Sequence, residues 1–264
     1  MTWSVGAGLE GRGVILTGAT GGIGAAVAKG FAAAGARVMA VDLDQARLDE
    51  VVGGLEGSGH VAAVADLRDL GSHDALVQRA VDELGEVYVL ANLAAVLRRR
   101  GSLDEVTEDD WDFQHDINVK SAFFLSRAAG NAMIAAGKGG RIILFSSQGW
   151  WTGGFGGSVA YASSKGGVTT LCRGLARTFG PHKITVNCVS PGQVHTPMLM
   201  TGLAPEIYES MKKQTPLGYV AEPEVVLAAV VPQHGEGFVR SDGVDLGDHP
   251  FGLFDDDAGV EGVL

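Results

Sequence analysis

Residues 14–24 read VILTGATGGIG, an apolar run that passes directly into a turn rich in glycine. After this turn Ile23, Val27 and Phe31 recur at a spacing of four residues, which is typical of one buried face of an α-helix. A branched apolar run, a glycine turn and an amphipathic helix in this order predict the first strand and helix of a βαβ unit. The stretch therefore indicates an α/β fold built on a parallel sheet.

The same alternation of strands and helices continues along the chain. We predict strands at 14–16, 37–41, 60–65, 87–90, 141–145 and 184–189, and helices at 72–84, 108–129 and 160–179. Strands that alternate with helices of this length give a Rossmann-type, doubly wound parallel sheet with helices on both faces. Because no repeat of fixed period and no linker-like stretch interrupts the pattern, residues 1–264 are predicted to form a single domain.

The C-terminal part departs from this regular alternation. We expect residues 196–215 to form a lid over a substrate. Pro223 can begin a helix and Pro232 should end it, and 238–244 are predicted as a last strand. Residues 242–264 form an acidic tail with seven acidic side chains and no Lys or Arg.

Composition and charge narrow the classes of function. The net charge is −11 and no basic face is evident, so the chain is not expected to bind nucleic acid. The run Arg98–Arg100 is interpreted as a solvated loop, with a phosphate site as the alternative. The sequence contains neither a signal-peptide pattern nor an apolar run of about 18 residues, so we expect a cytoplasmic protein without a membrane partner. Cys172 and Cys188 lie in apolar runs, which predicts reduced, buried thiols, and no metal site is expected.

The glycine turn also predicts a ligand, with a ligand-free turn as the alternative. Gly18, Gly22 and Gly24 allow a tight turn and a close approach of pyrophosphate to the N-terminus of the helix. Asp42 ends the next predicted strand, where an acidic side chain can accept hydrogen bonds from the hydroxyls of the adenine ribose. Its charge would repel a 2′-phosphate, and the neighbouring Leu43 adds no cation. We therefore predict that the cofactor is NAD.

Tyr161 and Lys165 place a phenol and an ammonium one helical turn apart. The pair follows the predicted strand 141–145, so it lies near the sheet edge where parallel sheets bind ligands. A second pair of the same spacing, Tyr208 and Lys212, follows no strand end and is interpreted as surface decoration.

These motifs resemble those of the short-chain dehydrogenase/reductase family over roughly residues 10–225. The matching pieces, in order, are TGATGGIG (17–24), Asp42, Asp66-Leu67, Asn92-Leu-Ala-Ala, Asn118, Ser147, YASSK (161–165) and Asn187 followed by SPGQVHT (190–196). The resemblance implies that Tyr161 is the catalytic acid/base and that Lys165 activates it. It also implies that Ser147 orients the carbonyl and that Asn118 anchors a water-linked proton relay. The implied cofactor contacts come from Gly18, Thr20, Gly22, Ile23, Gly24, Asp42, Leu43, Asp66, Leu67, Asn92, Tyr161, Lys165, Pro191, Gly192, Val194 and Thr196.

The tyrosine and lysine suit this chemistry. Hydride transfer from an alcohol requires removal of the hydroxyl proton, and a phenol with a pKa of about 10 is a poor base near neutral pH. A cation about 4 Å away, at an effective dielectric constant near 20, stabilises phenolate by roughly 4 kcal/mol. This equals about three pKa units, so we expect Lys165 to bring the pKa of Tyr161 to about 7.

Three features depart from the family pattern. Ser147 precedes Tyr161 by 14 residues, one more than the commonest spacing, so the Trp150-Trp151 loop is expected to carry an insertion. Ala95 replaces the usual glycine. The usual closing Asp-Gly-Gly is absent, and Gly247-Asp248-His249 lies nearby.

The leading hypothesis is an NAD-dependent oxidoreductase that interconverts a secondary alcohol and its ketone by hydride transfer. The alternatives are a polyol, sugar or hydroxy-acid dehydrogenase of the same family, and a non-catalytic NAD-binding regulator on the same fold. The intact Ser147, Tyr161 and Lys165 argue against a regulator. A nucleotide-sugar epimerase would need more than the 68 residues that follow Thr196, and enoyl-reductase relatives space tyrosine and lysine more widely.

The substrate is expected to carry a sizeable apolar, aromatic portion. Predicted substrate contacts come from Gln148, Trp150, Trp151, Phe155, Met198 and Met200, and the same segments supply Val96, Leu97, Leu199 and Leu203. Aromatic and methionine side chains bind flat apolar groups and adapt to their shape. The alternative is that Trp150 and Trp151 pack against a neighbouring subunit. By resemblance we expect a homotetramer paired through helices 108–129 and 160–179, with a dimer as the alternative.

Overall fold

The computed structural model describes residues 8–154 and 158–230, and these form a single α/β domain. Six parallel strands make one sheet in the order β3-β2-β1-β4-β5-β6. The strands are β1 (Gly13–Thr17), β2 (Arg37–Asp42), β3 (Val61–Val64), β4 (Val89–Asn92), β5 (Gly140–Phe145) and β6 (Ile184–Val189). The order reverses between β1 and β4, which is where doubly wound sheets bind ligands. The predicted fold class is confirmed.

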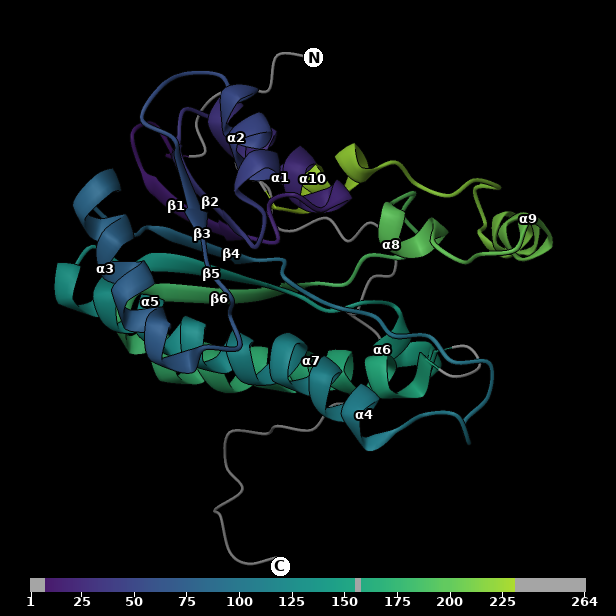
Figure 1. Ribbon diagram of the computed structural model, residues 1–264. Helices are drawn as coiled ribbons and strands as arrows, with labels where there is room; N and C mark the ends of the chain where they lie inside the picture. The colour runs from purple at the N-terminus through teal and green to yellow at the C-terminus, as the bar shows by residue number, and fades with distance from the viewer. Residues whose placement is uncertain (1–7, 155–157, 231–264) are drawn as a thin grey trace, which may run out of the picture.

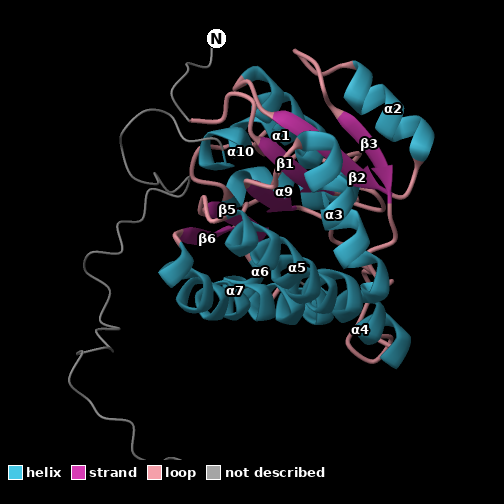
Figure 2. Cartoon of the chain, turned by 90° about the vertical axis from the view of Figure 1, so that its left-hand side faces the viewer, coloured by secondary structure: helices cyan, strands magenta, loops and turns pink. Residues whose placement is uncertain are grey.

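Helices cover both faces of the sheet, as Figure 1 and Figure 2 show. One face carries α1 (Gly22–Ala33), α2 (Gln45–Gly53) and α10 (Pro223–Val230), and the other carries α3 (His73–Leu84), α5 (Ser121–Ala136) and α7 (Val159–Phe179). In β1, Val14 and Leu16 pack into the core beneath α1, and Ile15 packs into the core on the opposite face. Because both faces are covered, the three central residues of β1, Val14 to Leu16, are all apolar.

The helix predicted at 108–129 is divided by a change of helical type. α4 (Glu108–His115) leads into a π-helical turn at Asp116–Lys120, and α5 follows. Thr107 and Asp110 begin α4 with a reciprocal capping box, in which each side chain accepts a hydrogen bond from the backbone N–H of the other residue. Asn118 lies in the π-helical turn and is buried.

Four further helices were not foreseen from the sequence. In α2, only Leu48 is buried, so its apolar periodicity is weak, although Asp44 caps it by accepting from the Arg47 N–H. The other three are α6 (Gly149–Thr152), α8 (Pro197–Met200) and α9 (Pro205–Gln214). α10 begins at Pro223, as predicted.

The strand predicted at 238–244 and the acidic tail at 242–264 lie outside the described residues. Among the helices of the described part of the chain, none is both long enough and apolar enough to cross a membrane.

Candidate active site

A cavity of about 860 Å³ opens at the edge where the parallel strands end. Its wall includes the glycine turn after β1, Asp42 at the end of β2 and the segments that follow β3, β4, β5 and β6. Most of the predicted cofactor contacts line this cavity: Gly18, Thr20, Gly22, Ile23, Gly24, Asp42, Leu43, Asp66, Leu67, Tyr161, Lys165, Pro191, Gly192, Val194 and Thr196. Segments far apart in the sequence are therefore brought together as the motifs require.

The glycine turn is built for close approaches. Gly18 has φ +67°, and a Cβ there would lie 2.8 Å from the Ala94 backbone nitrogen. A Cβ on Gly24 would lie 2.0 Å from the Gly18 carbonyl oxygen. The N-cap residue of α1 is Gly21, which supplies no side-chain cap to the first turn of the helix. The first N–H groups of α1 can therefore donate hydrogen bonds to an anion, and the turn fits the pyrophosphate of a dinucleotide.

Asp42 holds the glycine turn as well as facing the cavity. One carboxylate oxygen accepts from the Thr20 N–H at 2.9 Å and from the Thr20 hydroxyl at 2.7 Å, and the other accepts from the Leu43 N–H at 2.8 Å. The acid is thus fixed where a ribose would lie in this fold.

Two cations that the sequence argument overlooked lie at the same end of the cavity. Arg47 on α2 lines the cavity and donates to the Thr20 carbonyl at 2.7 Å. Arg68 lines it as well and pairs with Asp66, and this hydrogen bonding lowers the pKa of the Asp66 carboxyl. Leu43 adds no cation beside Asp42, but α2 brings Arg47 to the same end of the cavity.

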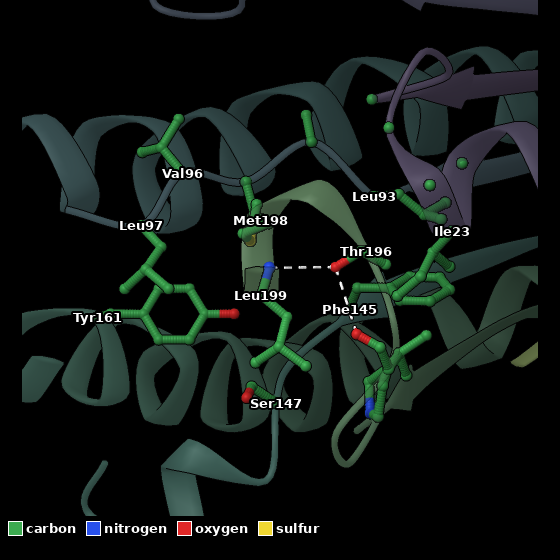
Figure 3. A pocket seen from close by; sticks show the side chains of 18 of the residues that line it. Ile23, Leu93, Val96, Leu97, Phe145, Ser147, Tyr161, Thr196, Met198 and Leu199 are labelled. Carbon is green, nitrogen blue, oxygen red and sulfur yellow. Dashed lines mark hydrogen bonds between the residues drawn. The ribbon is translucent and has the colours of Figure 1, made fainter. Parts of the chain in front are cut away.

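Tyr161 and Lys165 meet Ser147 on the opposite side of the cavity. Ser147 lies two residues beyond β5, and Tyr161 is in the first turn of α7. Figure 3 shows the Tyr161 hydroxyl directed into the cavity, with Leu199 and Met198 approaching it from α8. Lys165 follows one turn later, and its Nζ lies 5.7 Å from the centroid of the Tyr161 ring.

The ammonium group of Lys165 is buried in the protein interior. Its side chain is 3% exposed, and Nζ donates to the Phe145 carbonyl oxygen at 2.7 Å. Burial lowers the pKa of this ammonium from 10.5 to about 8.

The electrostatics of Tyr161 differ from the sequence-based expectation of a pKa near 7. Burial raises the pKa of the phenol above its ordinary value of 10, against the opposing effects of a hydrogen bond with Ser147 and the charge of Arg99. The physical reason is that the phenol is withdrawn from water, which disfavours its charged form. In this state Tyr161 is a proton donor.

Asn118 and Asn92 are buried beside the cavity and do not line it. The Asn118 side chain accepts from the Val96 N–H at 2.8 Å and donates to the Val96 carbonyl at 3.0 Å and to the Ser164 hydroxyl at 2.9 Å. Asn92 accepts from the Thr17 hydroxyl and so ties β4 to β1. Both side chains position segments that form the cavity wall.

The predicted substrate contacts are only partly brought together. Gln148 and Met198 line the cavity, together with Val96, Leu97, Leu199 and Leu203. Trp150, Trp151 and Met200 do not line it, and Phe155 lies outside the described residues. The short helix α6 is responsible, because it directs the two tryptophans outward in an edge-to-face pair, with Trp151 71% exposed. Ile207 and Met211 of α9, which were not foreseen, complete the apolar wall.

The run Arg98–Arg100 is more than the solvated loop that the sequence suggested. Arg100 pairs with both oxygens of Asp110, whose side chain is 1% exposed, and this pairing holds the pKa of Asp110 far below its usual range. Arg98 pairs with Asp109 and lies over the Phe113 ring, 3.8 Å from its centroid. The run therefore fixes the segment after β4 to the start of α4.

Cys172 and Cys188 are both free thiols, and burial is as predicted for Cys172, whereas Cys188 is half-buried. Cys172 is buried in the core of the α7 face, and Cys188 is close enough to Lys165 for the two groups to influence each other's titration.

Comparisons with known proteins agree with this geometry. A family model described as enoyl-(acyl carrier protein) reductase matches residues 18–232. The (2S)-[(R)-hydroxy(phenyl)methyl]succinyl-CoA dehydrogenase subunit BbsD of Thauera aromatica is 34% identical over 82% of this chain and 86% of its own length. D-threitol dehydrogenase of Mycolicibacterium smegmatis is 33% identical over 90% of this chain and 91% of its own. L-xylulose reductase of Bos taurus is 37% identical over 84% and 88%.

The fold also matches that of a solved structure. The crystal structure of a short-chain alcohol dehydrogenase from Sinorhizobium meliloti 1021 superimposes with a TM-score of 0.79 at 30% sequence identity, covering 85% of this chain and 89% of that one. The glycine turn, the tyrosine and lysine of α7 and these matches lead to one conclusion. The chain belongs to the short-chain dehydrogenase/reductase family.

Proposed function

We propose that this protein is an NAD(H)-dependent oxidoreductase that interconverts a secondary alcohol and its ketone. Dehydrogenases of the family use a nicotinamide cofactor, either NAD or NADP. The observation that carries the proposal is the Tyr161 hydroxyl, which points into the same cavity as the glycine turn, with Ser147 in the wall of that cavity. A group that can transfer a proton therefore shares one space with a fitted dinucleotide site.

The residues divide the chemistry between them. The nicotinamide, when bound, supplies or accepts the hydride. In ketone reduction Ser147 donates a hydrogen bond to the carbonyl oxygen, and Tyr161 transfers its proton to that oxygen as the alcohol forms. The positive charge of Lys165 stabilises the phenolate that remains. In alcohol oxidation the same phenolate accepts the hydroxyl proton.

NAD is proposed as the preferred cofactor because Asp42 places a negative charge where a 2′-phosphate would lie. Arg47 opposes this effect in part, since it adds a positive charge to the same end of the cavity. The Asp42 carboxylate is fixed by three hydrogen bonds, so it cannot swing away from a phosphate without losing them. A clear but incomplete preference is expected.

The apolar wall supports a substrate with an apolar portion next to the reacting carbon. Leu97, Met198 and Leu199 lie near Tyr161 in Figure 3, Val96 lines the same cavity, and α9 extends the wall. We propose that residues 196–215, which contain α8 and α9, act as the substrate lid, because they supply much of this wall. Apolar linings of this kind bind flat or branched hydrocarbon groups.

A polyol or sugar alcohol is the second candidate substrate. It is favoured by the relatives, which include D-threitol dehydrogenase, L-xylulose reductase and galactitol 2-dehydrogenase. Gln148 and Gln193 are the amide side chains in the cavity wall that could bind its hydroxyls.

A spectrophotometric screen tests the proposal. Aryl-alkyl ketones and cyclic ketones are reduced with NADH or NADPH, and the matching alcohols and polyols are oxidised with NAD or NADP. We expect the highest kcat/KM for aryl or cyclic compounds with NAD(H). Polyols oxidised with much higher kcat/KM would favour the second candidate, and no turnover of any compound would contradict the proposal.

A further inference from the structure

We propose that Arg99 binds a carboxylate of the substrate, so that the protein acts on secondary alcohols and ketones that carry a carboxylate beside an apolar portion. The inference deepens the proposed function and rests on it, because it assigns a substrate class to the same cavity.

The first observation is a difference within the arginine run. Arg98 and Arg100 are neutralised by the carboxylates of Asp109 and Asp110. Among the described residues, no carboxylate pairs with Arg99. The middle arginine is therefore the member of the run whose charge is uncompensated within the described part of the chain.

The second observation is the position of Arg99. Arg99 lines the cavity and donates through Nη1 to the carbonyl oxygens of Leu199 at 3.1 Å and Thr201 at 3.3 Å. These contacts hold the guanidinium at the lid, next to the apolar wall. The charge is near enough to Tyr161 to lower the pKa of its phenol. Arg99 thus lies within electrostatic reach of the reacting hydroxyl.

The other cations in the cavity wall bind other groups or lie away from the substrate end of the cavity. Lys165 is buried and donates to the Phe145 carbonyl. Arg68 pairs with Asp66, and Arg47 lies on α2 beside the glycine turn, both at the proposed dinucleotide end. Arg99 is the cation in the described cavity wall that faces the substrate end.

The chemistry of the Arg99 guanidinium favours a substrate carboxylate as its partner. Arg99 is exposed at the mouth of the cavity, so its charge is hydrated, and a carboxylate that enters the cavity exchanges part of that water for a charge-assisted hydrogen bond, which is stronger than the bond a neutral group can make. The two contacts in the structure use Nη1, and Nε and Nη2 lie in the same plane as further donors. A planar carboxylate matches this donor geometry better than single hydroxyls do.

A set of three matched ketones tests the inference. 4-Oxo-4-phenylbutanoate, its methyl ester and butyrophenone share the aryl ketone, and the first alone has a carboxylate. We expect wild-type kcat/KM with NADH to be about tenfold higher for the acid than for the ester. Arg99→Gln should lower the value for the acid about tenfold and change that for the ester less than about twofold. Arg99→Lys should keep part of the preference.

Lys213→Gln is the matched control, because it removes an exposed positive charge on α9 that does not line the cavity. It should leave the acid-to-ester ratio unchanged. An equal kcat/KM for acid and ester in the wild type would overturn the inference. It would also be overturned if Arg99→Gln lowered kcat/KM for the acid and the ester by the same factor, because Arg99 would then only hold the lid in place.

Calorimetric titration of the acid and of the ester into the NADH complex of each variant gives the ratio of their affinities without turnover. It separates the two proposals. If none of the ketones is reduced, the proposed function fails, and the binding ratio still decides the role of Arg99. If the neutral ketones are reduced and the acid has no binding advantage, only the carboxylate inference fails.

Discussion

Lys165 combines a positive charge with almost complete burial, and its protonation should set the upper pH limit of ketone reduction. Burial lowers its pKa from 10.5 to about 8, so the charged form is lost as pH rises through about 8. The phenolate formed at Tyr161 then loses its stabilising cation. We expect kcat/KM for a neutral ketone to fall about tenfold per pH unit above this value.

A pH profile of kcat/KM with butyrophenone and saturating NADH checks this expectation. NADH affinity measured over the same range is the control, because it reports whether the cofactor site itself titrates. A value of kcat/KM that stays constant to pH 10 would show that the Lys165 charge is not required.

Asp42 should decide between the two nicotinamide cofactors. Asp42→Ala removes the charge that repels a 2′-phosphate and leaves Arg47 in place to attract it. We expect the ratio of kcat/KM for NAD to that for NADP to fall by about tenfold or more. Asp49→Ala is the matched control, because Asp49 is an exposed acid on α2 that does not line the cavity. A wild-type enzyme that uses both cofactors equally would contradict the role given to Asp42.

At the scale of elements, the π-helical turn between α4 and α5 positions the segment after β4. Asn118 bonds to both the N–H and the carbonyl of Val96. Asn118→Ala leaves these two backbone groups without that partner, so we expect the free energy of unfolding to fall by about 1–3 kcal/mol and KM to rise. Urea unfolding and steady-state kinetics measure the two effects.

The exposed Asn131 on α5 offers the control for this substitution. Asn131→Ala should leave both unfolding and KM close to the wild-type values. An Asn118→Ala variant with unchanged KM would show that the segment after β4 holds its position without this side chain.

The elements also show what the sequence could and could not predict. Strands buried on both faces leave continuous apolar runs, and for this reason all six were placed to within a few residues. The break at Asp116–Lys120 was missed because a π-helical turn keeps the composition of a helix. α2 was missed because only Leu48 of it is buried, and with it the cation Arg47.

The sequence predicted those residues of the candidate site whose place follows directly from the strand or helix that they adjoin. The glycines, Asp42, Ser147, Tyr161 and Lys165 all reach one cavity. Trp150 and Trp151 could not be placed, because side-chain direction in α6 depends on packing that composition does not encode. The pKa of Tyr161 could not be predicted either, because burial of the phenol is a tertiary effect.

At the scale of the whole molecule, the face formed by α4, α5 and α7 exposes large apolar side chains. Trp111, Phe123 and Val159 are 45%, 39% and 43% exposed. Exposed groups of this kind favour association of subunits. We expect a homotetramer, with a dimer as the alternative, and light scattering at micromolar concentration measures the mass.

The double variant Trp111→Glu, Phe123→Glu should lower that mass by placing charges on the exposed face. A Glu substitution at the exposed Lys213 of α9 provides the control, since it should leave the mass unchanged. A wild-type protein that is monomeric by light scattering would contradict the expected assembly.

The central claim is that the Tyr161 phenol exchanges the proton that accompanies hydride transfer. Tyr161→Phe removes the hydroxyl and keeps the ring, so the most direct measurement is kcat of this variant beside its NADH affinity by fluorescence titration. The account predicts that kcat falls about 10³-fold or more while the Kd for NADH changes less than about twofold. A variant that keeps more than a few per cent of the wild-type rate with intact NADH binding would contradict it.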